Sequence, residues 1–272
     1  MLCKLFMVTY NDSVALNRTL SSCLEHGHSE SYELQITIIN NHSNLYIYPE
    51  FRDLVTVLNN QTRADFSNGH LARDYNAAIV NGFVDVNAPA CDLLITSQDD
   101  VDFQPDWLKY FALCHKTGLQ FISMGMGDMV CSYTIDAVRS IGMWDERFCG
   151  VGYQEEDYFR RAVRALGERC SINDYAHKRL WNPLYEDEEK DEFQFCARHE
   201  RDDEMRDRRV GNHGGFGFHG VCQSWLYEKW GSDCEKSWAT QDFSGAPMRG
   251  MNFFYPYFEL RLPNLSEKGY PV

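Results

Sequence analysis

The chain has 272 residues, of which 44% are hydrophobic, so it can bury a full core in one large domain with an elaborated end or in two domains. Its formal net charge of −14 argues against a nucleic-acid or anionic-membrane surface, because such surfaces are bound through Lys and Arg. No apolar run approaches the roughly 18 residues that a membrane span needs.

The ten cysteines indicate a reducing compartment. They are scattered without a C-x-x-C pair, which is typical of free thiols and not of a zinc site or a disulfide framework. The N-terminal stretch MLCKLFMVTYND reads as a strand and lacks the length and the cleavage site of a secretory signal. We therefore expect a soluble, cytoplasmic protein.

Strand-like and helix-like segments alternate over the first half of the chain. The predicted strands are 4–10, 33–40, 55–60 and 91–97, and the predicted helices are 13–27, 72–83 and 105–118. This alternation predicts an open α/β sheet with helices on both faces. The polar loops TYND, NNHSN and SQDD follow three of these strands, so we expect them to face one crevice at the carboxyl ends of the strands.

The second half is less regular. Residues 121–148 suggest one or two strands, a short helix and a glycine turn, and GVGYQEEDYFRRAVRALG predicts a helix that begins with acids. ERCSINDYAH reads as another strand, and the charge run 186–209 reads as a solvated helix or a mobile arm. The glycine-rich 211–220 reads as flexible. We predict one catalytic domain over 1–180 and a C-terminal extension over 181–272 that packs on it.

The turn SQDDVDFQPDW carries three aspartates, Asp99, Asp100 and Asp102, directly behind a buried strand. They could be solvated turn residues ahead of a helix that Asp106 caps. Like charges at contact distance repel one another unless a cation lies between them, however, and a hard divalent ion would resolve the conflict.

Five motifs in order carry a family resemblance: VTYN, IINNHSN, NGHLARDYNAAI, SQDDVDFQPDW and GMWDERFCGVGYQEEDYFRRA. Together they resemble the glycosyltransferases of the GT-A fold, and among them the inverting family 2 type, over roughly the first two thirds of the chain. The resemblance implies a stand-alone soluble enzyme of the kind found in bacteria or large DNA viruses. It also implies a nucleotide-sugar donor, most commonly a UDP-sugar, and a glycan or glycoprotein acceptor.

The resemblance assigns the nucleotide to residues of the first loops and of the aspartate turn. These residues are Thr9, Tyr10, Asn11, Asn40, His70, Arg73 and Asp99. Tyr10 would stack on the base, and Asn40 would bond its edge where the family more often has an aspartate. Asn11 could equally be an ordinary turn residue, and His70 is an alternative to Arg73.

The family's metal motif, D-x-D, falls on Gln98, Asp99 and Asp100, so Gln98 replaces the first acid. The resemblance makes Asp100 the ligand of Mn²⁺ or Mg²⁺, which are hard cations that suit carboxylate and diphosphate oxygens. Asp102 is a second ligand or belongs to the start of the helix cap. His177 is either a further ligand or a surface residue.

The second acidic motif of the family supplies the general base. Aligning the arginine that ends this motif with Arg161 places Glu155 at the base position, with Asp157 as the alternative. Trp144 and Asp145 would line the acceptor side.

Two rival functions stay open. A nucleotidyltransferase would need a glycine-rich phosphate loop, which VTYNDSVALNRT lacks. A non-catalytic carbohydrate-binding or scaffold protein would explain why Gln98 replaces an acid.

Overall fold

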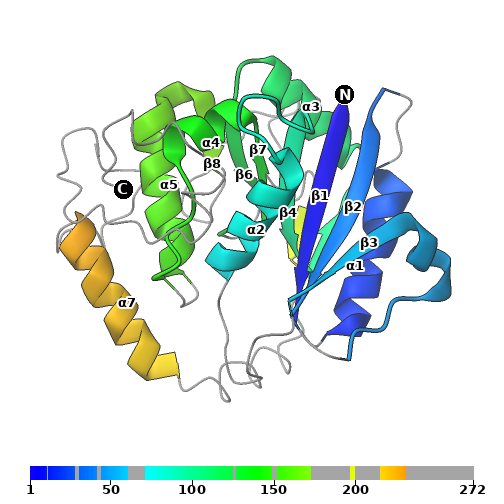
Figure 1. The fold of residues 1–272 in the computed structure, drawn as a ribbon, viewed down its shortest axis with the longest axis horizontal. Helices are drawn as coiled ribbons and strands as arrows, with labels where there is room; N and C mark the ends of the chain where they lie inside the picture. The colour runs from blue at the N-terminus through cyan, green and yellow to red at the C-terminus, as the bar shows by residue number, and fades with distance from the viewer. Residues whose placement is uncertain are drawn as a thin grey trace, which may run out of the picture.

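Figure 1 shows the chain in a computed structural model. The structure describes residues 1–10, 12–27, 31–41, 44–60, 71–124, 127–148, 152–172, 197–199 and 215–230. The strands are β1 Leu2–Thr9, β2 Glu33–Asn40, β3 Val55–Asn59, β4 Leu93–Gln98, β5 Val101–Phe103, β6 Phe121–Met124, β7 Val130–Tyr133, β8 Cys170–Ile172 and β9 Ala197–His199. The α-helices are α1 Ser13–His26, α2 Leu71–Phe83, α3 Trp107–Lys116, α4 Ile135–Ile141, α5 Tyr153–Leu166 and α7 Gly215–Trp230, and the 3₁₀-helices are η1 Pro49–Leu54 and η2 Gly167–Arg169.

A seven-stranded mixed sheet, in the order β3-β2-β1-β4-β7-β6-β8, forms the centre of the molecule. The strands β1 to β4 are parallel to one another, whereas β7 runs antiparallel to both β4 and β6. The carboxyl ends of β1 to β4 therefore lie together, at the lower edge of the sheet in Figure 1. The predicted open α/β sheet is confirmed.

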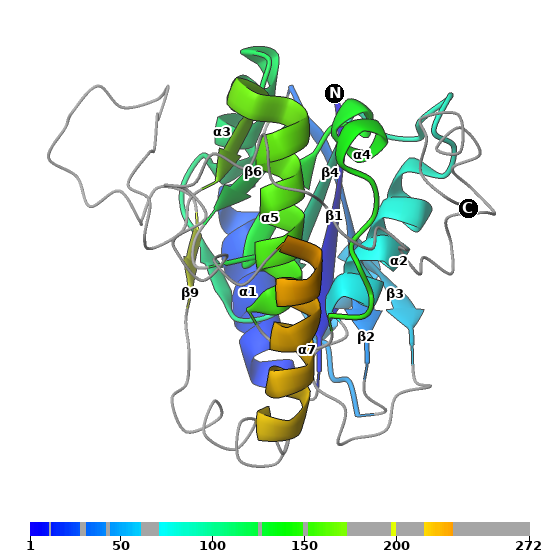
Figure 2. The same ribbon diagram turned by 90° about the vertical axis from the view of Figure 1, so that its left-hand side faces the viewer.

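Helices cover both faces of the sheet, as the two views in Figures 1 and 2 show. One apolar core joins the sheet to α1 and α3, and it includes Leu16, Leu20 and Trp107. The other joins the sheet to α2, α4 and α5, and it includes Tyr75 and Tyr158. The central strands β4, β6 and β7 are buried on both faces, whereas β3 at the edge of the sheet keeps exposed residues.

The starts of α1 and α3 differ in how they are capped. Asp12 caps α1 by accepting a hydrogen bond from the backbone N–H of Ala15 at 2.9 Å, and α1 ends at Gly27 as the sequence predicts. Asp106 precedes α3 with a left-handed φ of 61°, and its side chain makes no capping hydrogen bond within the described chain. Asp106 therefore occupies the N-cap position of α3 as that alternative requires, but its side chain does not cap the helix.

Helix α7 begins inside the glycine-rich segment, so the prediction of a flexible segment is wrong for residues 215–220. Cys222, Leu226 and Trp230 form a small apolar core with Phe148 and Tyr153, beside α5. Such tertiary packing outweighs the poor helix propensity of glycine. In Figure 2, α7 lies along α5. No described helix combines the length and apolar character needed to cross a membrane.

Part of the C-terminal prediction lies outside the described residues. Of the charge run 186–209, the structure describes residues 197–199, which form β9 and pair with β5. The predicted domain boundary at residue 180 also falls outside, so the division stays a prediction.

Candidate active site

Asp99 joins the carboxyl ends of β1 and β4. Its Oδ2 atom accepts hydrogen bonds from the hydroxyl of Thr9 at 2.7 Å and from the backbone N–H of Tyr10 at 3.4 Å. The hydroxyl of Thr19 on α1 donates to the Asp99 carbonyl at 2.8 Å. The structure thus brings together three residues predicted to bind the nucleotide, and it turns the buried Asp99 carboxylate towards β1.

An amide network ties the ends of β2 and β3 to α2. Asn40 donates to Asn59 at 2.9 Å. Asn41 and Asn60 donate to the two carboxylate oxygens of Asp74, at 2.8 and 3.2 Å. Asp74 is fully buried and was not singled out from the sequence. The sequence does contain one indication of Asp74: it is an acid on the apolar face of a helix, where burying an unpaired charge would cost free energy.

Asp128, in the turn between β6 and β7, is the centre of a second buried group. Its two carboxylate oxygens accept hydrogen bonds from the amide of Gln98 at 2.7 Å and from the amide of Gln154 at 3.3 Å. The Tyr75 hydroxyl donates to the Asp128 carbonyl at 3.0 Å. Asp128 therefore connects the end of β4 with α2 and with the start of α5. Sequence reasoning missed it because GMGDMV reads only as a turn between strands.

Glu155, the predicted base, lies half-buried in the first turn of α5. Its Oε2 atom accepts a hydrogen bond from the backbone N–H of Gly152 at 3.1 Å, so it caps the helix as well. Gly127, at a φ of 63°, lies so close that a Cβ there would stand 3.0 Å from Glu155 Oε1. Burial, followed by the charge of Asp128, raises the pKa of Glu155 well above its usual value.

Asp157, the alternative base, has a different environment two residues further along α5. Its carboxylate is fully buried and contacts Arg161 Nε at 3.0 Å, Lys229 Nζ at 2.7 Å and Trp230 Nε1 at 2.9 Å. Lys229 and Trp230 belong to α7, so this ion cluster fastens α7 to α5.

Asp145 belongs to the same ion cluster. It contacts Arg147 Nη2 at 2.6 Å and Lys229 Nζ at 3.0 Å. Burial alone raises the pKa of Asp145, but Arg147 and Lys229 outweigh burial and bring the pKa down to about 2. Trp144 is fully buried, with its ring stacked on Tyr158 at a centroid distance of 4.1 Å. An acceptor role for Trp144 or Asp145 stays a prediction that requires these contacts to open.

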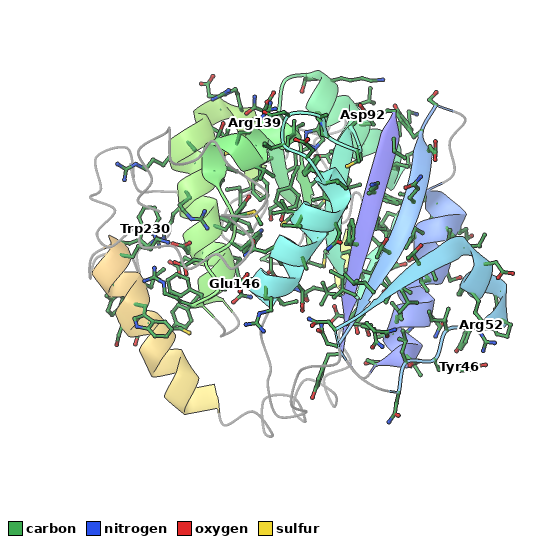
Figure 3. All side chains as sticks on the ribbon, in the orientation of Figure 1. Tyr46, Arg52, Asp92, Arg139, Glu146 and Trp230 are labelled. Atoms are coloured by element: carbon green, nitrogen blue, oxygen red, sulfur yellow. The ribbon has the colours of Figure 1, made fainter. Side chains whose placement is uncertain are left out.

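Arg73 reaches from α2 to the turn before α5. Its Nε atom lies 3.5 Å from Glu146 Oε2, and its side chain is 43% exposed. Asn76 holds the other Glu146 oxygen at 2.9 Å. Figure 3 shows Glu146 near the lower end of α2, on the side of the carboxyl edge of the sheet. Arg73 therefore keeps exposed surface there, as its predicted nucleotide role requires.

The predicted metal ligands are only partly described. Asp100 and Asp102 are half-buried, and Asp102 Oδ2 accepts a hydrogen bond from Gln104 at 2.6 Å. His177 lies outside the described residues, as do Asn11 and His70. Among the residues that are described, no three His, Cys, Asp or Glu side chains are grouped to hold a metal ion. Two carboxylates nevertheless fit Mg²⁺ or Mn²⁺ chemistry, because substrate phosphates commonly complete such a site.

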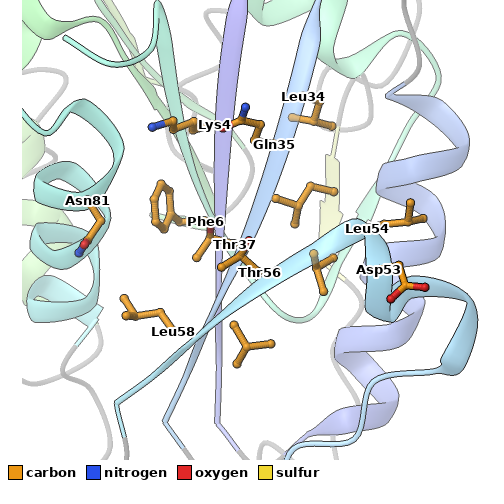
Figure 4. A pocket seen from close by; sticks show the side chains of 13 residues that line it. Lys4, Phe6, Leu34, Gln35, Thr37, Asp53, Leu54, Thr56, Leu58 and Asn81 are labelled. Carbon is orange, nitrogen blue, oxygen red and sulfur yellow. The ribbon is translucent and has the colours of Figure 1, made fainter. Parts of the chain in front are cut away.

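A groove of about 430 Å³ lies elsewhere, on the face of β1, β2 and β3 beside α2. Figure 4 shows Lys4, Phe6, Thr37, Leu58 and Asn81 around it. None of the predicted site residues lines this groove. It is therefore separate from the acidic groups described above.

The comparison with solved structures identifies the fold. S. aureus TarS superposes with a TM-score of 0.51 at 9% identity, over 84% of this chain and 40% of TarS. TarS 1–349 in complex with UDP gives a TM-score of 0.50 at 9% identity, over 89% of this chain and 75% of that one. Both are glycosyltransferases. The fold is of the GT-A glycosyltransferase type.

A third solved structure is less similar. It is the mannosyltransferase PcManGT from Pyrobaculum calidifontis, in complex with GDP-Man and Mn²⁺. Its TM-score is 0.47 at 8% identity, over 83% of this chain and 69% of its own. No protein-family model matches the sequence. No curated protein matches it either. The chain spans about 40% of the length of the first TarS chain, so the similarity supports a shared fold alone.

Proposed function

We propose that the chain is a metal-dependent glycosyltransferase that moves a sugar from a nucleoside diphosphate to a hydroxyl of a glycan or glycoprotein, with inversion. The observation that carries this proposal is Glu155, a half-buried carboxyl of raised pKa. It lies against Gly127, and the next residue, Asp128, accepts a hydrogen bond from Gln98 at the end of β4, where the aspartate turn begins. A UDP-sugar is the favoured donor, because a neighbour of the same fold was solved with UDP.

The chemistry is a single displacement. Glu155 takes the proton of the acceptor hydroxyl as its oxygen forms a bond to the anomeric carbon, and the bond from that carbon to the diphosphate oxygen breaks. Attack from the face opposite the leaving group inverts the configuration. The base is Glu155 and not Asp157, because two cationic side chains and an indole N–H already hold the carboxylate of Asp157.

The donor side is built on the ends of β1, β2 and β4. Thr9 and Asp99 fix the turn that carries Asp100, and they leave the half-buried Tyr10 beside it. We propose that Tyr10 stacks on the base, that Asn40 bonds its edge and that Arg73, with Asn11 and His70, completes the nucleotide site.

We propose that Asp100 holds Mn²⁺ or Mg²⁺, with Asp102 and His177 as further ligands. The ion would neutralise the charge of the departing diphosphate when bound. The extension 181–272 is proposed to belong to the same functional unit. The described cysteines are free thiols, which supports a cytoplasmic location.

The test is a screen of nucleotide sugars with Mn²⁺, Mg²⁺ or a chelator, in which the released nucleoside diphosphate is measured. We expect release only with a divalent ion, and its loss in Asp100→Asn. Asp106→Asn is the matched control, because Asp106 is an exposed acid of the same segment with no proposed role. A binding module would release no diphosphate, and a nucleotidyltransferase would instead release pyrophosphate from a nucleoside triphosphate and a sugar phosphate.

A further inference from the structure

We infer that Asp128 is a positioning residue for the proposed base, held charged beside Glu155 by the amides of Gln98 and Gln154 so that Glu155 retains the proton it takes from the acceptor. This inference rests on the proposed function and deepens it. Its evidence comes from three elements that meet at one turn: the end of β4, the β6–β7 turn and the start of α5.

The contacts of Asp128 favour its charged form. One carboxylate oxygen accepts from Gln98 and the other from Gln154, and an amide N–H can only donate. Hydrogen bonds donated to a carboxylate stabilise the ion over the acid. Asp128 is only 3% exposed, so these two amide hydrogen bonds offset the cost of burying its charge, which water screens only weakly.

The backbone brings Glu155 against the same turn. Gly127 precedes Asp128 and approaches the Glu155 carboxylate so closely that a Cβ there would meet Oε1. On its other side, Glu155 is fixed by the N–H of Gly152. Glu155 therefore lies against the turn that carries the Asp128 carboxylate, and a negative charge on Asp128 favours the protonated form of Glu155.

The other ionisable groups near this pair do not cancel that effect. Tyr75 on α2 and Cys131 on β7 both have a pKa raised by burial, so both are neutral around pH 7. Glu156, which adds to the raised pKa of Glu155, pairs with Arg160. The backbone N–H groups at the start of α5 lower the pKa of Glu155, but burial and the charge of Asp128 outweigh them.

The inference also explains why residue 98 is a glutamine and not an acid. An acid at this position, where the related motif has one, would place a carboxylate where Asp128 now accepts a hydrogen bond at 2.7 Å. Two like charges at that distance repel. The replacement of the acid by Gln98 is then an adaptation to Asp128 and not a sign of lost activity.

The direct test is a carbon NMR titration of the full chain with labelled Glu side chains. The Glu155 signal is assigned by its loss in Glu155→Gln. In the wild type we expect Glu155 to titrate above ordinary glutamates, and in Asp128→Asn we expect its midpoint to move to lower pH. Asp136→Asn, which removes an exposed acid paired with Arg139, is the control and should leave the midpoint in place.

Enzyme kinetics provide a second readout. The acid limb of the kcat/KM profile should move to lower pH in Asp128→Asn, because the base then deprotonates more readily, and turnover on the plateau should fall because it is a weaker base. An unmoved limb and an unmoved NMR midpoint, with Glu155→Gln inactive, would overturn this inference alone. A fully active Glu155→Gln would instead overturn the proposed base. If Asp128→Asn fails to fold, an ordinary Glu155 midpoint in the wild type still refutes the inference.

Discussion

Two acidic pairs flank the start of α5, and they are held by opposite means. Glu155 lies beside Asp128, which is bonded to amides, whereas Asp157 and Asp145 share the ammonium group of Lys229. Amides stabilise a carboxylate without bringing a net charge, so the neighbouring acid gains proton affinity. Cations remove proton affinity, as the lowered pKa of Asp145 shows. Carboxylates therefore lie in two different environments on the two sides of the helix, one proposed to serve chemistry and the other tying α7 to α5.

Helix geometry separates the two pairs. Successive residues turn by about 100°, so Glu155 and Asp157 project about 200° apart around α5. One points towards the β6–β7 turn and the other towards α7. A shift of two residues along α5 therefore moves a carboxylate from one of these environments to the other.

The largest expected effect is a loss of turnover on substitution of Glu155, the neighbour of the amide-bonded Asp128. Glu155→Gln keeps an oxygen that can accept from Gly152 but cannot take a proton, so turnover should fall by roughly 10²- to 10⁴-fold. Donor binding, measured by calorimetry, should stay near the wild-type value. Asp157→Asn should mainly lower the melting temperature. The reverse outcome, an active Glu155→Gln and an inactive, folded Asp157→Asn, would place the base two residues later.

A loss of stability is expected when Lys229, the cation shared by Asp145 and Asp157, is replaced. Lys229→Met leaves Asp145 and Asp157 buried without their shared ammonium, and it should lower the free energy of unfolding by about 3–5 kcal/mol. Urea unfolding followed by tryptophan fluorescence measures this change. A double-mutant cycle with Asp157→Asn should show a coupling energy, since the two residues are in contact. A loss below about 1 kcal/mol in the single variant would contradict the role given to the cluster.

The smallest effect is expected from an exposed ion pair, which contrasts with the buried cluster around Lys229. Lys109 and Asp106 form an ion pair at 3.9 Å, and both side chains are about half exposed. Lys109→Ala should change the free energy of unfolding by about 0–1 kcal/mol, because water screens such a pair. The same urea experiment checks it. A loss as large as that of Lys229→Met would mean that burial does not account for the difference between the two lysines.

The sequence predicted the fold well because its signals are local. The apolar run of β4 and the helical spacing of α1 each depend on a few neighbouring residues. The sequence also predicted that the loops after β1 and β4 lie at one edge, because parallel strands place their carboxyl ends together, and the contact between Thr9 and Asp99 lies at that edge.

The ionic partners could not be predicted in this way. Asp128 contacts Gln98 across 30 residues, and Lys229 contacts Asp145 across 84. No periodicity encodes such pairs. Trp144 illustrates a related limit, since the sequence does not reveal that Tyr158 covers its ring. The prediction that residues 215–220 are flexible was wrong because the packing of α7 against distant residues outweighs the low helix propensity of glycine.

The hydrogen bond between Thr9 and Asp99 has a consequence for protein engineering. Residue 9 ends β1 at the proposed donor site, where donor preference would be redesigned, and its hydroxyl also fixes the residue that precedes Asp100. A substitution there would remove the hydrogen bond to Asp99, so it would disturb the proposed nucleotide site and the proposed metal ligand at the same time. Tyr10 contacts Asp99 through its backbone N–H, so its side chain can be exchanged while that contact is kept. Directed evolution of donor choice should therefore begin at position 10 and leave position 9 unchanged.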